Sequence, residues 1–295
     1  MSVRLLALAL LLAGCSAPSP ETPRIDKQQA AWAAQCDDDS GWDDPGPAFK
    51  VYGNTYYVGT CGIASILITG DDGHVLIDSG TDKGAELVVA NIRALGFDPA
   101  DVKILLMTHE HGDHVGGIAR LQQVTGAKLL ASPAAAEALA SGKATKDDPQ
   151  FESDPGFKPA QVSGQVEDGV PITVGNLSLT PVFTPGHTPG ATSWQWRSCE
   201  GSECRGIAYI DSLSPVSSDT YRFSDHADYL AAFRSSLTRL PELDCDILLT
   251  PHPSASGMRE RLATGALGDG SGCKAYAADR GKLLDERLVN EADGQ

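Results

Sequence analysis

Basic residues are scarce in this sequence. Its 295 residues include 23 Lys and Arg against 39 Asp and Glu, so the formal net charge is −16 at pH 7. A nucleic-acid-binding surface needs clustered Lys and Arg to contact phosphate, and this composition therefore argues against one. Long apolar runs are missing too: "LLALALLLA", near the start, is far shorter than the roughly 20 residues that a membrane-spanning helix needs. With 41% hydrophobic residues, the chain can still bury a core.

The first residues have the composition of an export signal. "MSVR" is positively charged, "LLALALLLA" is apolar and small residues follow. The end of this run, "LLAGC", resembles a bacterial lipobox, in which cleavage precedes a cysteine that is then acylated. We therefore expect a signal peptide over residues 1–14 and a lipid on Cys15, which would anchor a periplasmic protein to the outer membrane. An ordinary secretory signal, cleaved between Ala13 and Ala17, is the alternative.

The cysteines are consistent with export. If Cys15 carries a lipid, six remain, an even set that an exported protein can oxidise. Cys199 and Cys204 flank "EGSE", which indicates a turn between two strands, and a disulfide would close that turn. Elimination and chain order give the other two expected pairs, Cys36 with Cys61 and Cys245 with Cys273.

Strand-like and helix-like segments alternate after a Pro- and Ser-rich stretch. We expect a tether and N-terminal segment over residues 15–45 and a single domain over residues 46–295. Apolar runs rich in β-branched residues predict strands, over residues 49–59, 64–69, 74–80, 102–108, 127–132, 170–184, 192–198, 205–211 and 245–250. Helical periodicity and glycine stops predict helices, over residues 84–96, 115–126, 133–141, 226–240 and 274–292. Strands and helices follow a similar order in both halves, which favours two sheets packed face to face with helices outside.

A cluster of histidines follows one of the buried strands. "MTHEHGDHVGG" places His109, His111, Asp113 and His114 between a strand and a helix, and its glycines allow the backbone to turn. His187 in "TPGHTPG" and His252 in "TPHPS" also follow strands, where loops carry functional sites.

Imidazole and carboxylate groups are zinc ligands, and a catalytic zinc usually has three protein ligands and an open position. Any one of these histidines alone is more often exposed or hydrogen-bonded, but together the six groups predict two such sites. His74 and His226 lack this context, and we expect them to be surface residues.

The pattern H-x-H-x-D-H with later histidines resembles the metallo-β-lactamase superfamily, from about Phe49 to the end. The resemblance implies an α/β fold, a four-layer αββα sandwich of two mixed sheets. "VYGNTYYVGTCGIASILITGDDGHVLIDSG", "GHTPGATSW", "YIDSLS" and "CDILLTPHPSASG" look like the true β-lactamases of subclass B3. It follows from that similarity that His109, His111 and His187 hold one Zn²⁺, and that Asp113, His114 and His252 hold a second.

The resemblance also implies a reaction. A zinc-bound hydroxide would hydrolyse the β-lactam amide bond of penicillins, cephalosporins and carbapenems, giving antibiotic resistance. Asp113 would orient the hydroxide, and Ser214 and Ser212 would serve substrate binding. We expect a monomer whose contact with membranes is through the lipid on Cys15.

Two alternative functions and one substrate contact stay open at this stage. If Asp211 rather than Ser212 faced the metals, as an Asp does in glyoxalase-type hydrolases, a thioesterase or lactonase would be favoured. A zinc-binding lipoprotein without catalysis is a third possibility. Gln150 in the loop "DDPQF" is a candidate substrate contact, although it is also explained as an ordinary surface residue.

Further residues are candidates for the rim of a substrate groove and for partners of the metal ligands. The segment near Trp32 and Trp42 is a candidate rim of the groove. Asp78, Ser79 and Asp211 are candidate partners of the ligating histidines, since such imidazoles usually donate their second N–H to an acceptor.

Overall fold

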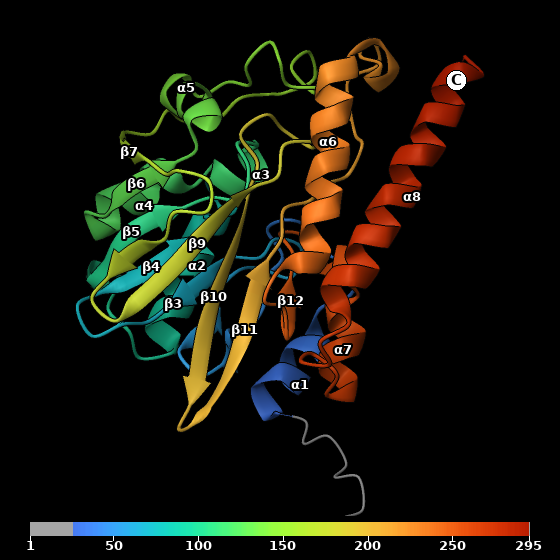
Figure 1. Cartoon of the computed structure of the whole chain (residues 1–295). Helices are drawn as coiled ribbons and strands as arrows, with labels where there is room; N and C mark the ends of the chain where they lie inside the picture. Colours follow the sequence, from blue (N-terminus) through green and yellow to red (C-terminus); the bar gives the residue numbers. More distant parts are fainter. Residues whose placement is uncertain (1–25, 295) are drawn as a thin grey trace, which may run out of the picture.

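A computed structural model describes residues 26–294 of the chain (Figure 1). The expected signal peptide and the expected lipidation site, Cys15, lie outside these residues. Within residues 26–294, no helix combines the length and the apolar character needed to cross a bilayer.

Two mixed sheets form the centre of the molecule. In the described residues, the first sheet has the order β1-β2-β3-β4-β5-β6-β7, antiparallel from β1 to β4 and parallel from β4 to β7. Its strands are β1 Phe49–Tyr52, β2 Thr55–Tyr57, β3 Ile66–Ile68, β4 His74–Ile77, β5 Val102–Leu106, β6 Lys128–Ala131 and β7 Val162–Gln165.

The second sheet has the order β12-β11-β10-β9-β8, with only the β11–β12 pair parallel. Its strands are β8 Ile172–Val174, β9 Leu177–Phe183, β10 Thr192–Glu200, β11 Glu203–Tyr209 and β12 Ile247–Leu249.

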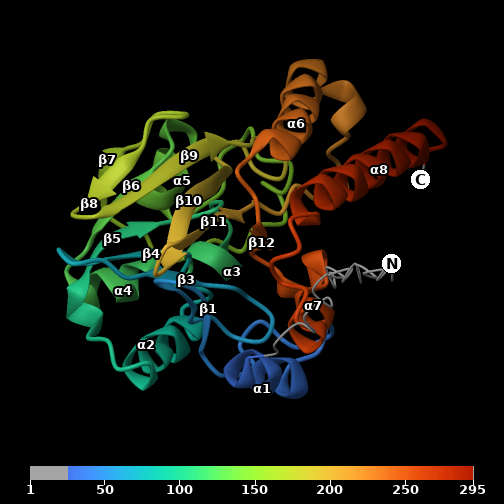
Figure 2. The same ribbon diagram turned by 60° about the horizontal axis from the view of Figure 1, so that its bottom comes forward.

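Helices cover the outer faces of the sheets, so the molecule has four layers (Figure 2). Apolar side chains of α2, α4 and α5 pack on the first sheet, and those of α6 and α8 pack on the second. The helices of the described residues are α1 Lys27–Gln35, α2 Gly84–Ala94, α3 Gly112–Val115, α4 Ile118–Thr125, α5 Pro133–Ser141, α6 Ala227–Arg239, α7 Met258–Thr264 and α8 Gly272–Ala292. The expected αββα sandwich is confirmed.

The space between the sheets holds the central apolar core. It contains aromatic side chains from both sheets, including Phe49, Tyr57 and Trp194. Trp194 also donates its indole N–H to the carbonyl of Met107, 2.9 Å away, which fixes β10 against the chain just after β5. The core therefore positions the strand ends that carry the histidines.

The N-terminal segment differs from the expectation. Residues 27–35 form α1, which lies beside α7 (Figure 1) and packs Trp32 edge-on against the stacked rings of Phe49 and Tyr57. The described part of the expected tether is thus an integral part of the fold, because the run "AAWAA" supplies an apolar face. Trp32 is 1% exposed and is not a rim residue, so the prediction was wrong for Trp32, whereas Trp42 is exposed.

Three disulfide bonds occur among residues 26–294. They join Cys36 to Cys61, Cys199 to Cys204 and Cys245 to Cys273. The Cys199–Cys204 bond closes the β10–β11 turn, and the Cys36–Cys61 bond ties the end of α1 to the loop after β2.

Candidate metal centre

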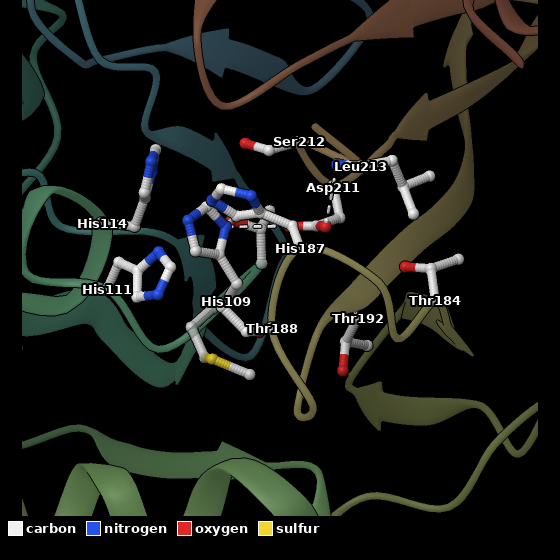
Figure 3. A network of polar contacts seen from close by, with 12 residues as sticks. His109, His111, His114, Thr184, His187, Thr188, Thr192, Asp211, Ser212 and Leu213 are labelled. Carbon is white, nitrogen blue, oxygen red and sulfur yellow. Dashed lines mark hydrogen bonds and ion pairs between the residues drawn. The ribbon is translucent and has the colours of Figure 1, made fainter. Parts of the chain in front are cut away.

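The six predicted ligands come together at one edge of the sandwich. His109 follows β5, His111 precedes α3, and Asp113 and His114 lie within α3. His187 follows β9 and His252 follows β12, so both sheets contribute. Figure 3 shows the imidazoles of His109, His111, His114 and His187 gathered at these strand ends.

The backbone around β4 and β5 is shaped to hold the motif. Asp78 has a left-handed backbone (φ 64°), which is unfavourable for residues other than glycine. Its carboxylate accepts hydrogen bonds from the N–H and hydroxyl of Thr108 and from the hydroxyl of Tyr209, at 2.7, 2.8 and 2.7 Å. These bonds offset the backbone cost and fix the residue that precedes His109.

One ring nitrogen of each histidine in the first group is held by the protein. Nδ1 of His109 lies 2.8 Å from Asp211 Oδ1, Nε2 of His111 lies 3.0 Å from Asp148 Oδ2, and Nδ1 of His187 lies 2.9 Å from the Ser214 carbonyl. The other nitrogens are left for a metal ion, and Nε2 of His109 is buried without a hydrogen-bond partner. Ligand atoms of all three histidines lie within 4.8 Å of one another.

The second group is more compact. Asp113 Oδ2 lies 3.0 Å from Nε2 of His114 and 3.4 Å from Nε2 of His252, and those two nitrogens are 3.2 Å apart. Tetrahedral ligands about 2.05 Å from one zinc ion are about 3.3 Å apart, so the three spacings fit a shared cation. His109, Asp113 and His114 also have ligand atoms within 4.8 Å of one another, so the two groups are contiguous.

Burial favours the neutral form of two of these histidines. It lowers the pKa of His109 well below its ordinary value and that of His187 to about 3, and neighbouring histidines add to the effect. Burial alone would raise the pKa of Asp113, but His114 and His252 hold it well below the ordinary range. The pKa values of His111 and His114 are instead raised, because contacts with the carboxylates of Asp148 and Asp113 outweigh the effect of burial. Neutral His109 and His187 beside an ionised Asp113 fit the donor set of a zinc ion.

A groove of about 590 Å³ opens onto the cluster. His111, Asp113, His187 and His252 form part of its lining, so the candidate ligands are accessible from one side. Trp42, which is 55% exposed, and Val216 give the groove an apolar wall.

Two of the three predicted substrate contacts line the groove, and the third does not. Ser214 and Gln150 line the groove, and Nε2 of Gln150 is buried without a hydrogen-bond partner. Ser212 is 4% exposed and is not part of the lining. The Ser214 hydroxyl lies 3.0 Å from Nδ1 of His187.

The expected partners of the histidines are all nearby, with different roles. Asp211 contacts His109 and, through Oδ2, the N–H of Leu213, so it lies beside the cluster rather than among its ligands (Figure 3). Ser79 donates to the backbone carbonyl of His114, and Asp78 Oδ2 is 3.8 Å from Nδ1 of that histidine.

Two buried carboxylates of the site were not predicted. Asp148 contacts His111 from the aperiodic loop 144–161, and only the acidic run "KDDPQ" signals it. Glu110 lies between His109 and His111 in the motif and hydrogen-bonds the loop that carries His187. Neither remaining histidine joins the cluster: His74 packs on Phe97, and His226 is exposed and stacks on Tyr221.

Comparison with known proteins agrees with this geometry. Residues 58–199 match the family described as "Metallo-beta-lactamase superfamily". The solved structure of the MIM-2 metallo-beta-lactamase is 55% identical, with a TM-score of 0.87, over 91% of this chain and 100% of that one.

The chain belongs to the metallo-beta-lactamase superfamily. MEM-A1, described as a subclass B3 metallo-beta-lactamase from a soil metagenome library, is 39% identical over 86% of this chain and all of its own, with a TM-score of 0.83.

Curated relatives with partial matches include hydrolases of other substrates. The N-acyl homoserine lactonase AttM of Agrobacterium fabrum (strain C58) is 38% identical over 36% of this chain, and the match spans only 40% of the lactonase. Membership of the superfamily therefore establishes the fold and leaves the metal and the substrate to be argued from the site.

Proposed function

We propose that this protein is a zinc-dependent β-lactamase that binds two zinc ions. The main support for this proposal is the set of donor groups. Two adjacent triads of ligand residues open onto one groove. Similarity to MIM-2 along nearly the whole chain favours a β-lactam over other substrates. His109, His111 and His187 would hold one ion, and Asp113, His114 and His252 the other.

Bound zinc would supply a Lewis acid and lower the pKa of a coordinated water to about 7. The residues would do the rest. Asp113 belongs both to the donor cluster and to the groove lining, so its carboxylate is placed to orient the attacking water. In the overall hydrolysis, a carbon–oxygen bond forms at the lactam carbonyl, the carbon–nitrogen bond of the ring breaks, and a proton from water ends on the nitrogen.

Ser214 is the candidate anchor for a substrate carboxylate. Its hydroxyl lies beside Nδ1 of His187 and also lines the groove. The imidazole N–H at Nδ1 would be shared between this oxygen and the carbonyl of the same serine, which leaves the hydroxyl proton free to point into the groove. Gln150 would add a second polar contact, because it is part of the groove lining.

Purified protein tests the proposal with a carbapenem as substrate. Turnover should disappear after chelation and return when zinc is added, and metal analysis should find two zinc ions per chain. His252→Ala should lower the zinc content toward one and abolish most turnover. His226→Ala is the matched control, because that histidine is exposed and outside the cluster. Zinc binding without carbapenem hydrolysis would contradict the proposed substrate.

A lactone is the second candidate substrate, since curated relatives include lactonases. The position of Asp211 bears on this candidate, because an Asp211 that faced the metals would favour a lactonase. Its carboxylate is turned to His109 and Leu213, and it does not belong to either ligand group. An N-acyl homoserine lactone assayed beside the carbapenem distinguishes the two: a larger kcat/KM for the lactone would favour the second candidate.

We further propose a periplasmic protein anchored through Cys15. The chain resembles a lipoprotein precursor at "LLAGC". Cys15→Ala should move the protein from the membrane fraction to the soluble fraction, and unchanged membrane association would contradict the anchor.

A further inference from the structure

Glu110 connects two of the three chain segments that carry the candidate ligands. It lies between His109 and His111, and its side chain reaches the loop that follows β9. Oε2 accepts the hydroxyl of Thr188 at 2.7 Å, and Oε1 accepts the N–H of Gly190 at 2.8 Å. Thr188 directly follows His187.

The arrangement carries an electrostatic cost. Glu110 is 2% exposed, and within residues 26–294 no Lys or Arg forms an ion pair with it. Removing a carboxylate from water is unfavourable unless hydrogen bonds or charges replace the water. Here both carboxylate oxygens accept hydrogen bonds from a single loop. These bonds therefore fix the position of that loop relative to Glu110.

A backbone hydrogen bond also joins β10 to the segment that precedes the histidine motif. The N–H of Thr192 donates to the carbonyl of Thr108 at 2.7 Å, so β10 is already tied to the segment just before His109. The Glu110 carboxylate extends this connection from the backbone to the turn at His187. The rings of His111 and His187 have centroids 4.9 Å apart, on either side of this junction.

We propose that Glu110 is a positioning residue that sets the spacing of His187 from His109 and His111 and thereby the zinc affinity of the first triad. It contacts neither substrate nor metal, and it acts through Thr188 and Gly190. The inference rests on the proposed metal site and is independent of which substrate is hydrolysed.

The test is competition for zinc against a chromogenic chelator, measured together with thermal unfolding of the zinc-free protein. Glu110→Ala should weaken binding of the zinc held by the first triad by about 10- to 100-fold, the range seen when partners of metal ligands are removed. Glu110→Gln should stay within about threefold, because its carbonyl can still accept from Gly190 and its amide can donate to the Thr188 hydroxyl.

Thr188 provides a second, milder pair of variants. Thr188→Val removes one of the two hydrogen bonds and should weaken zinc binding, whereas Thr188→Ser keeps the hydroxyl and should restore it. In the double variant, Glu110→Ala with Thr188→Val, zinc affinity should be no lower than in Glu110→Ala alone, because both changes break one interaction. These variants keep the inference testable if Glu110→Ala does not fold.

Glu291→Gln is the matched control. Glu291 is also a 2% exposed carboxylate that accepts two backbone N–H groups, from Phe223 and Ser224, but none of its hydrogen bonds reaches a candidate ligand. It should lose stability and keep its zinc affinity. If Glu110→Ala and Thr188→Val likewise lose only stability, Glu110 is structural and the inference is overturned. A wild-type protein that binds no zinc would overturn the proposed function itself.

Discussion

Oδ2 of Asp148 lies 3.0 Å from Nε2 of His111, across 37 residues of sequence. The same carboxylate accepts the N–H of Gln150 through Oδ1 at 2.7 Å. Asp148 therefore joins a candidate metal ligand to the loop that forms one wall of the groove. The pair also leaves Nδ1 of His111 as the nitrogen for a metal ion.

We expect Asp148→Ala to weaken zinc binding by about 10- to 100-fold, since the imidazole loses the acceptor that orients it. Chelator competition measures this directly. Asp147→Asn is the control, because Asp147 is the exposed neighbour in the same loop. Equal zinc affinities in the wild type and Asp148→Ala would show that His111 is oriented without Asp148.

Gln150→Ala should act on substrate binding. If the unpartnered amide nitrogen donates to the substrate, its loss removes one hydrogen bond worth about 0.5–1.5 kcal/mol. KM for a carbapenem should rise by about 2- to 12-fold while kcat changes little. Gln161→Ala, an exposed glutamine that does not line the groove, should leave both constants unchanged. A fall in kcat without a change in KM would contradict a role in ground-state binding.

Stability should depend on Glu291 in a pH-dependent manner. Burial alone would raise its pKa, but hydrogen bonds from Ser224 and Phe223 and the Arg287 guanidinium hold it below the ordinary value. A lowered folded-state pKa stabilises the protein above the unfolded value of about 4.3, and this contribution is lost as the pH falls through the folded pKa.

Urea unfolding of Glu291→Gln should therefore show a deficit of about 1.5–3 kcal/mol at pH 7. The deficit should shrink as the pH falls through the folded-state pKa of Glu291, because the wild-type carboxylate is then protonated too. A deficit that is independent of pH would exclude the carboxylate charge as its cause.

The disulfides should differ in their contribution to stability. Cys36 and Cys61 are 25 residues apart and Cys199 and Cys204 only 5, so the loop-entropy argument assigns the first about 3.5 kcal/mol and the second about 2 kcal/mol. Paired Cys→Ser substitutions, compared by urea unfolding, measure both values. The reverse order would show that native contacts, rather than the entropy of the unfolded chain, dominate.

The sequence predicts the cluster well because its signals are local. Each candidate ligand follows an apolar strand and is accompanied by glycine or proline, so its place at a sheet edge can be read directly. Asp148 lacks such a signal: its loop has no periodicity, and its partner His111 is distant in the chain. Glu110 was missed for a similar reason, since its two donors lie about 80 residues further on.

The N-terminal helix shows another limit of the same approach. "KQQAAWAAQ" follows a Pro- and Ser-rich stretch, and composition alone groups it with the tether. Its place in the core depends on Trp32 packing edge-on against the rings of Phe49 and Tyr57, a tertiary contact that no local pattern encodes.

The candidate ligands come from three segments on both sheets, and His114 and His252 are 138 residues apart in the chain. Such a set exists only in the folded protein, so the proposed metal binding would add to its stability. At a free zinc concentration 100 times the Kd, one site contributes about 2.7 kcal/mol. In surroundings depleted of zinc, the chain would therefore lose the proposed catalytic activity and become more susceptible to proteolysis at the same time. Metal starvation would shorten the lifetime of the protein as well as abolish that activity.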